Sequence, residues 1–475
     1  SGCGNGGDDN KGNDSSNKKE VTVSLLVPKD FEEEIRYALK SFNEIHPEII
    51  VDVIVSSGYG DSIPSELSTL AAGKNLPDVT MGTENFGYIL SQGLAYPLDN
   101  LYAADADKDN ALQAGITNYT YDGHLYAMPY RVQFNGIIVN LDLIQTQNLD
   151  EPDYSWSIEE FIDLAKKATD NQHSGINIVE STDDTHALQT KLLGGMMDAP
   201  YQMYGYNMDN HQFDFTSGAW TKAQEYIKEL QSVPGLVSDE LKEWDKRNNG
   251  IADAYDNKFG GSADAFKAGK VLFGNHNTWE THWISKGVNF EWDVYPVPTA
   301  DGVEERIQTH VDYVMMTTAV TEEKAQAAYE LVKFFSYSEE GCLARMKYVE
   351  ENSETATIYT PASSDPEVLK AYEDSDAIKD GMKYMLETIS EDPEMIFIAD
   401  VNKLVPNFWN DVNDYLDQTK EQIKNGGDAH ALAQDLQNKV NAAASAGARA
   451  LSSWIKSPRW LSSSSPIGVS KETGS

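Results

Sequence analysis

Apolar and polar residues alternate along the first part of the chain in a strand–helix–strand pattern. Segments 21–27, VTVSLLV, and 48–56, EIIVDVIVS, are apolar runs of the length expected for buried strands. The helix between them is predicted by apolar residues spaced three and four apart, namely Phe31, Ile35, Leu39, Phe42 and Ile45. Pro47 ends this helix, and a second helix ending near Gly73 leads to a third strand at 77–82. The alternation predicts an α/β fold, with a parallel or mixed sheet covered by helices.

The segment 121–140, YDGHLYAMPYRVQFNGIIVN, joins a tight turn to a buried strand. Asp122-Gly123 tolerates the positive φ values of a type I′ hairpin turn. The apolar run at 136–139 is typical of a strand that is covered on both faces. Between them, residues 129–135 combine a proline, an arginine, two amides and two large aromatic side chains. Such a stiff, extended and polar segment suits a crossing between two domains.

A helix with a well-defined start is predicted after this segment. Ser157 and Glu160 have the spacing of a capping box, and Trp156 and Phe161 flank it as a hydrophobic staple. Trp156 is therefore expected to pack in the core. The chain from Pro361 onward is predicted to be mostly helical.

Two further pairs of elements are expected in the second half of the chain. The stretch ADAFKAGK predicts a helix that ends at Gly269, directly before a strand at 271–273. A strand at 310–320 leads into a helix capped by Thr321 with acidic residues in its first turn. These elements continue the α/β pattern.

Length and charge narrow the function classes. The 475 residues exceed one ordinary core, so two or three domains are expected. Acidic residues outnumber basic ones 76 to 37, which gives a formal net charge of −39. This charge repels nucleic acid and anionic lipid, so no nucleic-acid partner is expected. No stretch reaches the roughly 18 apolar residues that suggest a membrane span.

The acidic loop DADKDN resembles a calcium loop only in part. Asp105, Asp107 and Asp109 have the spacing of its first three ligands. Asn110 stands where the loop needs glycine, and Ile116 stands where it needs glutamate. A solvated acidic loop is the expectation, and neither a metal nor a cofactor is predicted.

The two cysteines lie in different contexts. Cys342 is on the apolar side of a predicted helix, as a buried free thiol would be. Cys3 precedes a Gly/Asn/Asp/Ser-rich run that cannot form a core and is expected to be a flexible tether. "S-G-C" before such a spacer resembles the end of a bacterial lipoprotein signal. That resemblance implies an exported protein, lipid-anchored to the outer face of the cell membrane; an incidental cysteine in a disordered tail is the alternative.

Seven stretches, taken in order, resemble the family 1 extracellular solute-binding proteins of bacterial ABC transporters, the sugar-binding group that includes maltose-binding protein. The resemblance runs from about Val21 to Trp454. Its stretches are SFNEIHPEIIVDV, AAGKNLPDVTMG with SQGLAYPLDNL, YDGHLYAMPYRVQFNGIIVNLDLI, the SWSIEEF helix start, AFKAGKVLFGNHNTWE, VYPVPTADG and EEKAQAAYELVKFFSYSEEG. Each stretch is only moderately specific, and their common order carries the resemblance.

The resemblance implies a two-lobed, periplasmic-binding-protein-like fold of type II. Each lobe is a mixed sheet flanked by helices, and extended crossings at 130–135, 294–298 and 355–361 act as hinges. The implied N-terminal lobe comprises 20–134 and 297–354, and the C-terminal lobe 135–296 and 355–456. Residues 1–19 would be the disordered lipoprotein tether and 457–475 a disordered tail.

Sugar sites combine aromatic platforms with carboxylates, amides and arginine, and this composition guides the choice of candidate residues. In the resembled family a stacking tryptophan often stands at the position of Trp279, and a second aromatic on a C-terminal helix at that of Trp409. Trp279 as a packing residue at a helix start is the alternative for the first. The alternative for Trp409 is that it packs on the helix beside Phe408.

The remaining candidates come from the crossing and from a strand end. Arg131 and Gln133 would face the ligand, with Tyr130 or Phe134 stacking; hinge packing with an ordinary salt bridge is the alternative. Two more, Glu84 and Asn85, follow the carboxyl end of the third strand, where α/β sheets place ligand contacts. Asp312 could reach the cleft, or could be a surface or capping residue. Met81 and Gly82 stand where maltose-binding protein has a tryptophan, which puts specificity for malto-oligosaccharides in doubt.

The sequence favours a binding protein over an enzyme. The resemblance implies a monomer that captures an oligosaccharide by hinge closure and delivers it to the transmembrane subunits of an ABC permease, with contact to the membrane only through the lipid anchor. A secreted glycosidase, which needs two facing carboxylates, is an alternative. A binding protein for another solute and a lipid-anchored adhesin or sensor are the others. No GxSxG, HExxH or glycine-rich phosphate motif supports catalysis.

Overall fold

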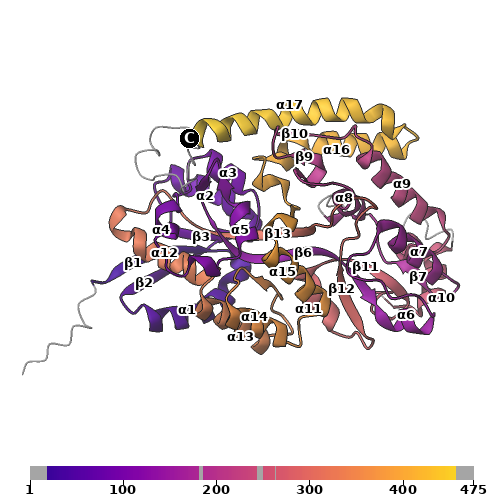
Figure 1. Cartoon of the computed structure of the whole chain (residues 1–475), viewed down its shortest axis with the longest axis horizontal. Helices are drawn as coiled ribbons and strands as arrows, with labels where there is room; N and C mark the ends of the chain where they lie inside the picture. Colours follow the sequence, from indigo (N-terminus) through magenta and orange to yellow (C-terminus); the bar gives the residue numbers. More distant parts are fainter. Residues whose placement is uncertain (1–18, 181–185, 243–249, 263, 456–475) are drawn as a thin grey trace, which may run out of the picture.

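The computed structural model describes residues 19–180, 186–242, 250–262 and 264–455, and one large sheet organises them (Figure 1). This sheet contains ten of the strands in the described residues, seven of them in the order β2-β1-β3-β13-β6-β11-β7. β12 and β14 pair with β6, and β15 pairs with β13. We call the elements around β1–β3 the first lobe and those around β7 and β11 the second lobe.

The first lobe is built on the parallel strands predicted from the apolar runs. Its strands are β1 (Val21–Val27), β2 (Ile49–Val55) and β3 (Val79–Gly82). The helices of this lobe are α1 (Glu32–Ile45), α2 (Ile63–Ala72), α3 (Phe86–Ser91), α4 (Asp99–Ala103), α5 (Gln113–Asn118), α12 (Glu322–Ser336), α13 (Glu339–Glu351) and α14 (Pro366–Asp374). The carboxyl ends of β1 and β3 point toward the middle of the molecule (Figure 1).

The second lobe also combines strands with flanking helices, but its strands form a mixed sheet. Its strands are β7 (Ser174–Ile176), β11 (Val271–Asn277) and β12 (Trp292–Pro296). Its helices are α6 (Leu141–Thr146), α7 (Ile158–Ala168), α8 (Leu188–Gly194), α9 (Ala219–Ser232), α10 (Ile251–Phe259), α11 (Thr281–Ser285) and α15 (Asp380–Glu391), which packs on β12. A short 3-10 helix, η9 (Thr278–Glu280), follows β11 directly.

The long strand β6 (Met128–Asn140) passes from one lobe into the other, and all of its residues are buried. Its first part pairs antiparallel with β13 (Ile307–Met316), up to the pair Phe134–Thr309. From Asn135 onward it pairs with β11 and β12. β14 (Thr360–Pro361) adds a short pairing at Arg131. The segments predicted to cross between the lobes therefore meet along this one strand.

The C-terminal helices lie along the top of the molecule in Figure 1. These are α16 (Phe408–Lys424) and α17 (Ala429–Ile455), preceded by β15 (Ile396–Ile398) and the 3-10 helix η11 (Val401–Lys403). They cover a hydrophobic cluster shared with α9 and with a small sheet of β8 (Tyr201–Gln202), β9 (Tyr206–Asn207) and β10 (Gln212–Phe213). α17 also contacts α3 of the first lobe.

Several local predictions are confirmed. β4 (Thr120–Tyr121) and β5 (His124–Leu125) form the hairpin, with φ of 51° at Asp122 and 79° at Gly123. Both hydrogen bonds of the capping box at the start of α7 are present, and the rings of Trp156 and Phe161 lie 5.5 Å apart.

The prediction of a helix before Gly269 is wrong, because residues 265–269 form turns instead. Hydrogen bonds from Ala268 to Asp264 and from Lys270 to Ala265 close only a single turn. Gly269 then adopts a φ of 78° and sends the chain into β11. The segment is thus too short for a helix, although the glycine ends it as expected.

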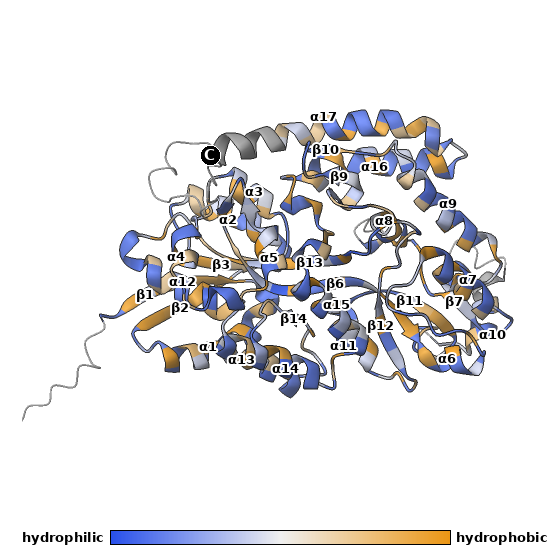
Figure 2. Ribbon diagram, in the orientation of Figure 1, coloured by the Kyte–Doolittle hydropathy of each residue, from blue (hydrophilic) through white to orange (hydrophobic). Residues whose placement is uncertain are grey.

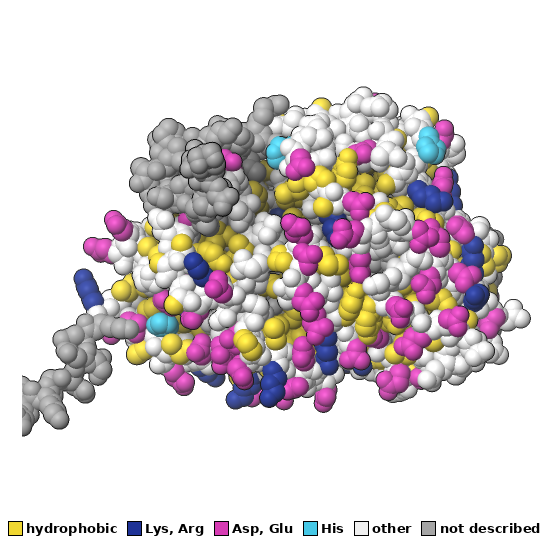
Figure 3. All heavy atoms as spheres, in the orientation of Figure 1, with side chains coloured by type: hydrophobic (Ala, Val, Ile, Leu, Met, Phe, Trp, Pro, Cys, Tyr) yellow, Lys and Arg dark blue, Asp and Glu magenta, His cyan; other side chains and the backbone are white. Residues whose placement is uncertain are grey.

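Polarity follows the fold in the usual way. Figure 2 shows hydrophobic residues concentrated in the strands, while most helices carry polar stripes toward solvent. On the face seen in Figure 3, acidic side chains are spread over both lobes and exceed the basic ones, in line with the net charge of −39. Among the helices in the described residues, none combines the length and apolarity needed to cross a bilayer.

Candidate functional site

The crossing has one polar and one apolar face, set by strand alternation. Gln133 pairs with His310 and Arg131 with Asp312, so these side chains share one face of the two strands. We define the crossing face as the polar side chains of this surface, namely Arg131, Gln133 and Asn135 of β6 with Gln308, His310 and Asp312 of β13.

The candidates Tyr130 and Phe134 alternate with the crossing face along β6 and are fully buried. The Tyr130 ring stacks on Phe31 with 5.6 Å between centroids, and the Arg345 guanidinium lies 4.0 Å from its centre. Both aromatic side chains therefore lie inside the hydrophobic cluster that includes the first-lobe core, and neither ring is exposed in this structure.

Arg131 and Asp312 form a buried ion pair at the first-lobe end of the crossing face. Arg131 Nε donates to Asp312 Oδ2 at 2.5 Å, and the two side chains are 10% and 7% exposed. The Arg131 guanidinium also lies 4.3 Å from the ring centre of Phe31. Burial raises the pKa of the Asp312 carboxyl, and the neighbouring guanidinium opposes that rise. The two candidates lie together and neutralise each other.

Gln133 fastens the second lobe to the crossing. Its side-chain oxygen accepts a hydrogen bond of 2.6 Å from Thr278 Oγ1, and its amide nitrogen donates to the main-chain oxygen of Ile358 at 3.1 Å. Thr278 Oγ1 also accepts from the backbone N–H of Phe134 at 2.9 Å. These bonds hold Thr278 at the start of η9 and so position Trp279, the next residue of that short helix.

Trp279 lies half-buried between two imidazole rings. Its ring centroid is 5.2 Å from that of His186, which precedes α8, and 5.0 Å from that of His310. The His310 contact is edge-on, at an interplanar angle of 86°. The tryptophan thus stands beside the crossing face at the carboxyl end of β11, with part of its surface open to a ligand.

A buried lysine, Lys191, bonds β6 and β11 next to the crossing face; we call this region the junction. Lys191 Nζ donates to Asn275 Oδ1 at 2.6 Å, to the main-chain oxygen of His276 at 2.7 Å and to that of Gly136 at 3.4 Å. Burial lowers its pKa to about 7. Burial, with this ammonium nearby, also lowers the pKa of His276 to about 3, so that imidazole is neutral.

Glu84, Asn85 and Trp409 form a second group between α3 and α16. Asn85 Nδ2 donates to Asn407 Oδ1 at 3.0 Å, and the Asn407 backbone N–H donates to Asn85 Oδ1 at 3.1 Å. The side chain of Glu84 is exposed, while Trp409 is half-buried, 5.8 Å from the ring of Tyr204. Asn85 thus joins the first lobe to the C-terminal helices.

Sequence reasoning missed several polar residues at the junction. Asp400 and Lys403, near η11, are buried and ion-paired at 2.9 Å, and the charge of Lys403 acts on both Asp312 and His310. His186, His310 and Lys191 carry no motif in the sequence. Strand alternation from Asp312 could have placed His310 on the same face, but no sequence signal connects His186 or Lys403 with the crossing.

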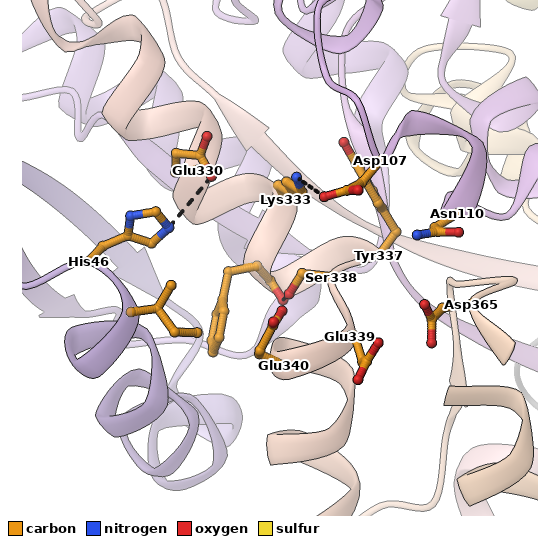
Figure 4. Close-up of a pocket in the computed structure, with 12 residues that line it drawn as sticks. His46, Asp107, Asn110, Glu330, Lys333, Tyr337, Ser338, Glu339, Glu340 and Asp365 are labelled. Carbon is orange, nitrogen blue, oxygen red and sulfur yellow. Dashed lines mark hydrogen bonds and ion pairs between the residues drawn. The ribbon is translucent and has the colours of Figure 1, made fainter. Parts of the chain in front are cut away.

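A separate hollow of about 390 Å³ opens on the first lobe between α1, α12 and α13 (Figure 4). Its wall contains Lys333, which lies 2.9 Å from both Asp105 and Asp107. His46 lies 3.6 Å from Glu330 across the same hollow. These charges are already paired, and the hollow is lined by none of the crossing face. We therefore place the candidate site at the crossing.

The acidic loop at 105–109 is solvated, as expected, at Asp107 and Asp109, which are exposed, but not at Asp105. The Asp105 side chain is only 8% exposed, because Lys333 and Tyr337 bind it. In the described ranges there is no group of three or more His, Cys, Asp or Glu side chains arranged to hold a metal ion. Cys342 is buried as expected and donates to the main-chain oxygen of Ser336 at 3.3 Å.

Comparisons with solved structures give the fold. An ABC substrate-binding protein from Listeria monocytogenes, in complex with cycloalternan, matches at a TM-score of 0.61 and 19% identity over 89% of this chain and 99% of that one. A family 1 extracellular solute-binding protein from Alicyclobacillus acidocaldarius matches at a TM-score of 0.64 and 16% identity, over 90% of this chain and 98% of that one. The cyclic alpha-maltosyl-1,6-maltose binding protein from Arthrobacter globiformis matches at a TM-score of 0.62 and 15% identity, over 91% of this chain and all of that one.

The sequence itself identifies the family. No curated protein sequence matches the chain. The model of the bacterial extracellular solute-binding protein family matches residues 38–368, more than half of the chain. This family consists of binding proteins rather than enzymes, which agrees with the prediction made from the sequence. The chain belongs to the bacterial extracellular solute-binding protein family.

Proposed function

We propose that this solute-binding protein captures an oligosaccharide at the crossing between its lobes and delivers it to an ABC permease. The observation that carries the proposal is the half-buried Trp279 beside the polar crossing face. An indole binds the C–H face of a sugar ring, and the neighbouring polar groups meet its hydroxyls. A sugar ligand is supported by two similar solved structures, the Listeria protein in complex with cycloalternan and the cyclic alpha-maltosyl-1,6-maltose binding protein.

Closure of the two lobes would enclose the ligand. β6 pairs with first-lobe strands up to Phe134 and with second-lobe strands from Asn135. A change of backbone torsions near this point moves one lobe against the other, as hinges in two-lobed proteins do. The crossing at 130–135 is therefore the proposed hinge. The proposed moving units are 20–134 with 297–354 and 135–296 with 355–456, except that α14 (Pro366–Asp374) packs on α13 and moves with the first lobe.

Attachment to the cell is a separate proposal that rests on Cys3. The Ser-Gly-Cys sequence and the polar spacer after it support lipidation, which lies outside the described residues. Expression of the chain behind a bacterial lipoprotein leader tests this idea. A membrane-bound wild type and a released Cys3→Ser variant are expected, whereas equal release of both would remove the anchor from the account.

Calorimetric titration of the whole chain tests the sugar ligand. The panel comprises maltotriose, cycloalternan, cellotriose and xylotriose, with spermidine and an arginine-rich tripeptide as cationic non-sugar solutes. We expect binding by at least one oligosaccharide, recovered unchanged by chromatography after the titration. Binding only by the non-sugar solutes would refute the sugar ligand, and recovery of cleaved sugar would refute the assignment as a binding protein.

A further inference from the structure

The side chain of His310 is tied into a hydrogen-bonded chain whose direction is fixed. Gln308 Nε2 donates to the main-chain oxygen of Lys191 at 2.7 Å, and a carbonyl oxygen can only accept. The oxygen Oε1 of Gln308 therefore faces Asn135 and accepts from Asn135 Nδ2 at 3.0 Å. This leaves Asn135 Oδ1 facing His310 Nε2 at 2.8 Å.

This series of hydrogen bonds selects one tautomer of His310. Asn135 Oδ1 is an acceptor, so His310 Nε2 must carry the proton that it donates. Burial lowers the pKa of His310 well below its ordinary value, and the positive charges of Lys403, His186 and Lys191 add to this effect. The imidazole is therefore neutral, and Nδ1 carries a lone pair.

Within the part of the chain that the structure describes, this lone pair has no hydrogen-bond partner. Among the described residues, none donates a hydrogen bond to His310 Nδ1, and the side chain is only half-buried. Trp279 stands edge-on to the same imidazole with ring centroids 5.0 Å apart. An acceptor with a fixed direction thus stands beside an aromatic surface, and a ligand that covers the indole can reach it.

We propose that His310 Nδ1 accepts a hydrogen bond from a hydroxyl of the ligand bound at Trp279. The inference rests on the proposed function and adds a requirement to it: the ligand must offer an O–H donor next to the face that stacks on the indole. A neutral sugar with a free hydroxyl there satisfies both groups. An analogue methylated or deoxygenated at that hydroxyl leaves the acceptor unpaired, which weakens binding.

Two substitutions separate this role from a structural one. His310→Asn keeps an acceptor near the position of Nδ1 but cannot reach Asn135 as Nε2 does. His310→Gln keeps a donor near the position of Nε2 but removes the acceptor beside Trp279. Binding of the tightest sugar in the panel by calorimetry, together with the thermal midpoint of the ligand-free chain, is measured for both variants and the wild type.

We expect His310→Gln to weaken sugar binding by more than about tenfold, in line with the loss of one buried hydrogen bond to a ligand, and His310→Asn to weaken it by less than about threefold. The reverse order, with His310→Asn impaired and His310→Gln normal, would assign His310 to the structure only. Equal affinity in all three chains would also overturn the inference while leaving the proposed function intact. If no sugar binds the wild type, both fail.

Nitrogen NMR of the ligand-free chain provides a readout that needs no sugar. With the ring nitrogens labelled, His310 should show a protonated Nε2 and an unprotonated Nδ1 near pH 7, assigned by comparison with His310→Gln. Addition of the bound sugar should shift the Nδ1 signal upfield, as expected when a lone pair accepts a hydrogen bond. The opposite tautomer, or an unmoved Nδ1 signal in the sugar complex, would contradict the proposed contact.

Discussion

Removal of one charge from the pair Arg131–Asp312 should destabilise the chain far more than removal of one charge from an exposed pair. The substitution Asp312→Asn keeps the shape of the side chain but leaves the Arg131 guanidinium buried without its carboxylate. The paired atoms are 2.5 Å apart, and the two side chains are 10% and 7% exposed. Water therefore cannot replace the lost partner.

The size of the effect follows from this burial. Two unit charges about 4 Å apart attract by about 4 kcal/mol at an effective dielectric constant near 20, and loss of one partner of a buried pair costs about 3–5 kcal/mol. The contact between Arg131 and Phe31 at 4.3 Å remains and offsets a small part of this loss. We expect the free energy of unfolding to fall by about 3 kcal/mol.

Urea unfolding at neutral pH provides the assay, with Asp163→Asn as the matched control. Asp163 pairs with Lys167 at 2.8 Å, but both side chains are more than half exposed, so its loss should cost less than about 1 kcal/mol. The double variant Arg131→Met/Asp312→Asn should regain stability relative to Asp312→Asn, because no charge is left unpaired. If Asp312→Asn lowers stability no more than Asp163→Asn does, the reasoning about this pair is wrong.

Four further predictions address the site and the scaffold. Trp279→Ala should weaken oligosaccharide binding more than about tenfold with a nearly unchanged thermal midpoint, as for an aromatic contact residue, and calorimetry showing unaltered affinity would exclude it from the site. Burial holds the pKa of His276 at about 3, so only the unfolded chain gains this proton as pH falls below about 6.5. Stability should therefore decrease by about 2 kcal/mol from pH 7 to about pH 5 through this group, and urea midpoints of His276→Asn should change less over that range; parallel profiles would contradict this. Gly381→Ala should lower the thermal midpoint markedly, with a loss above about 2 kcal/mol, because a Cβ there would overlap the main-chain oxygen of Val294; a wild-type melting curve would refute this packing. Ser157→Ala removes the capping hydrogen bond of 3.0 Å to Ser157 Oγ and should lower the free energy of unfolding in urea by about 1 kcal/mol. Unchanged stability would contradict a contribution from this cap.

Elements governed by local signals could be predicted from the sequence. The hairpin at Asp122-Gly123 and the start of α7 at Ser157 depend on neighbouring residues, and both form as expected. The short strands β8, β9, β10 and β15 have two or three residues each, too few for a periodic pattern. β15 forms because the distant strand β13 pairs with it, and β8, β9 and β10 pair with one another, with the backbone of Phe213 bonded to Asn441 of α17. Tertiary pairing therefore decides what the local sequence leaves open.

From the residues alone, the sequence could point to candidate site residues only on the crossing itself. Arg131, Gln133 and Asp312 meet on one face because the register of β6 and β13 aligns them. Trp279, which was a candidate only through the resemblance, lies beside them. His310 was missed because its importance depends on the tautomer fixed through Asn135, which is a product of the folded hydrogen-bond chain.

A crystal structure of the chain with the tightest-binding oligosaccharide of the panel would test the central claim most directly. The account predicts electron density for a sugar ring against the indole of Trp279, with a ring hydroxyl within hydrogen-bond distance of His310 Nδ1. Density for the sugar elsewhere, for example in the hollow beside Lys333, with Trp279 and His310 uncovered, would contradict the assignment of the site to the crossing between the lobes.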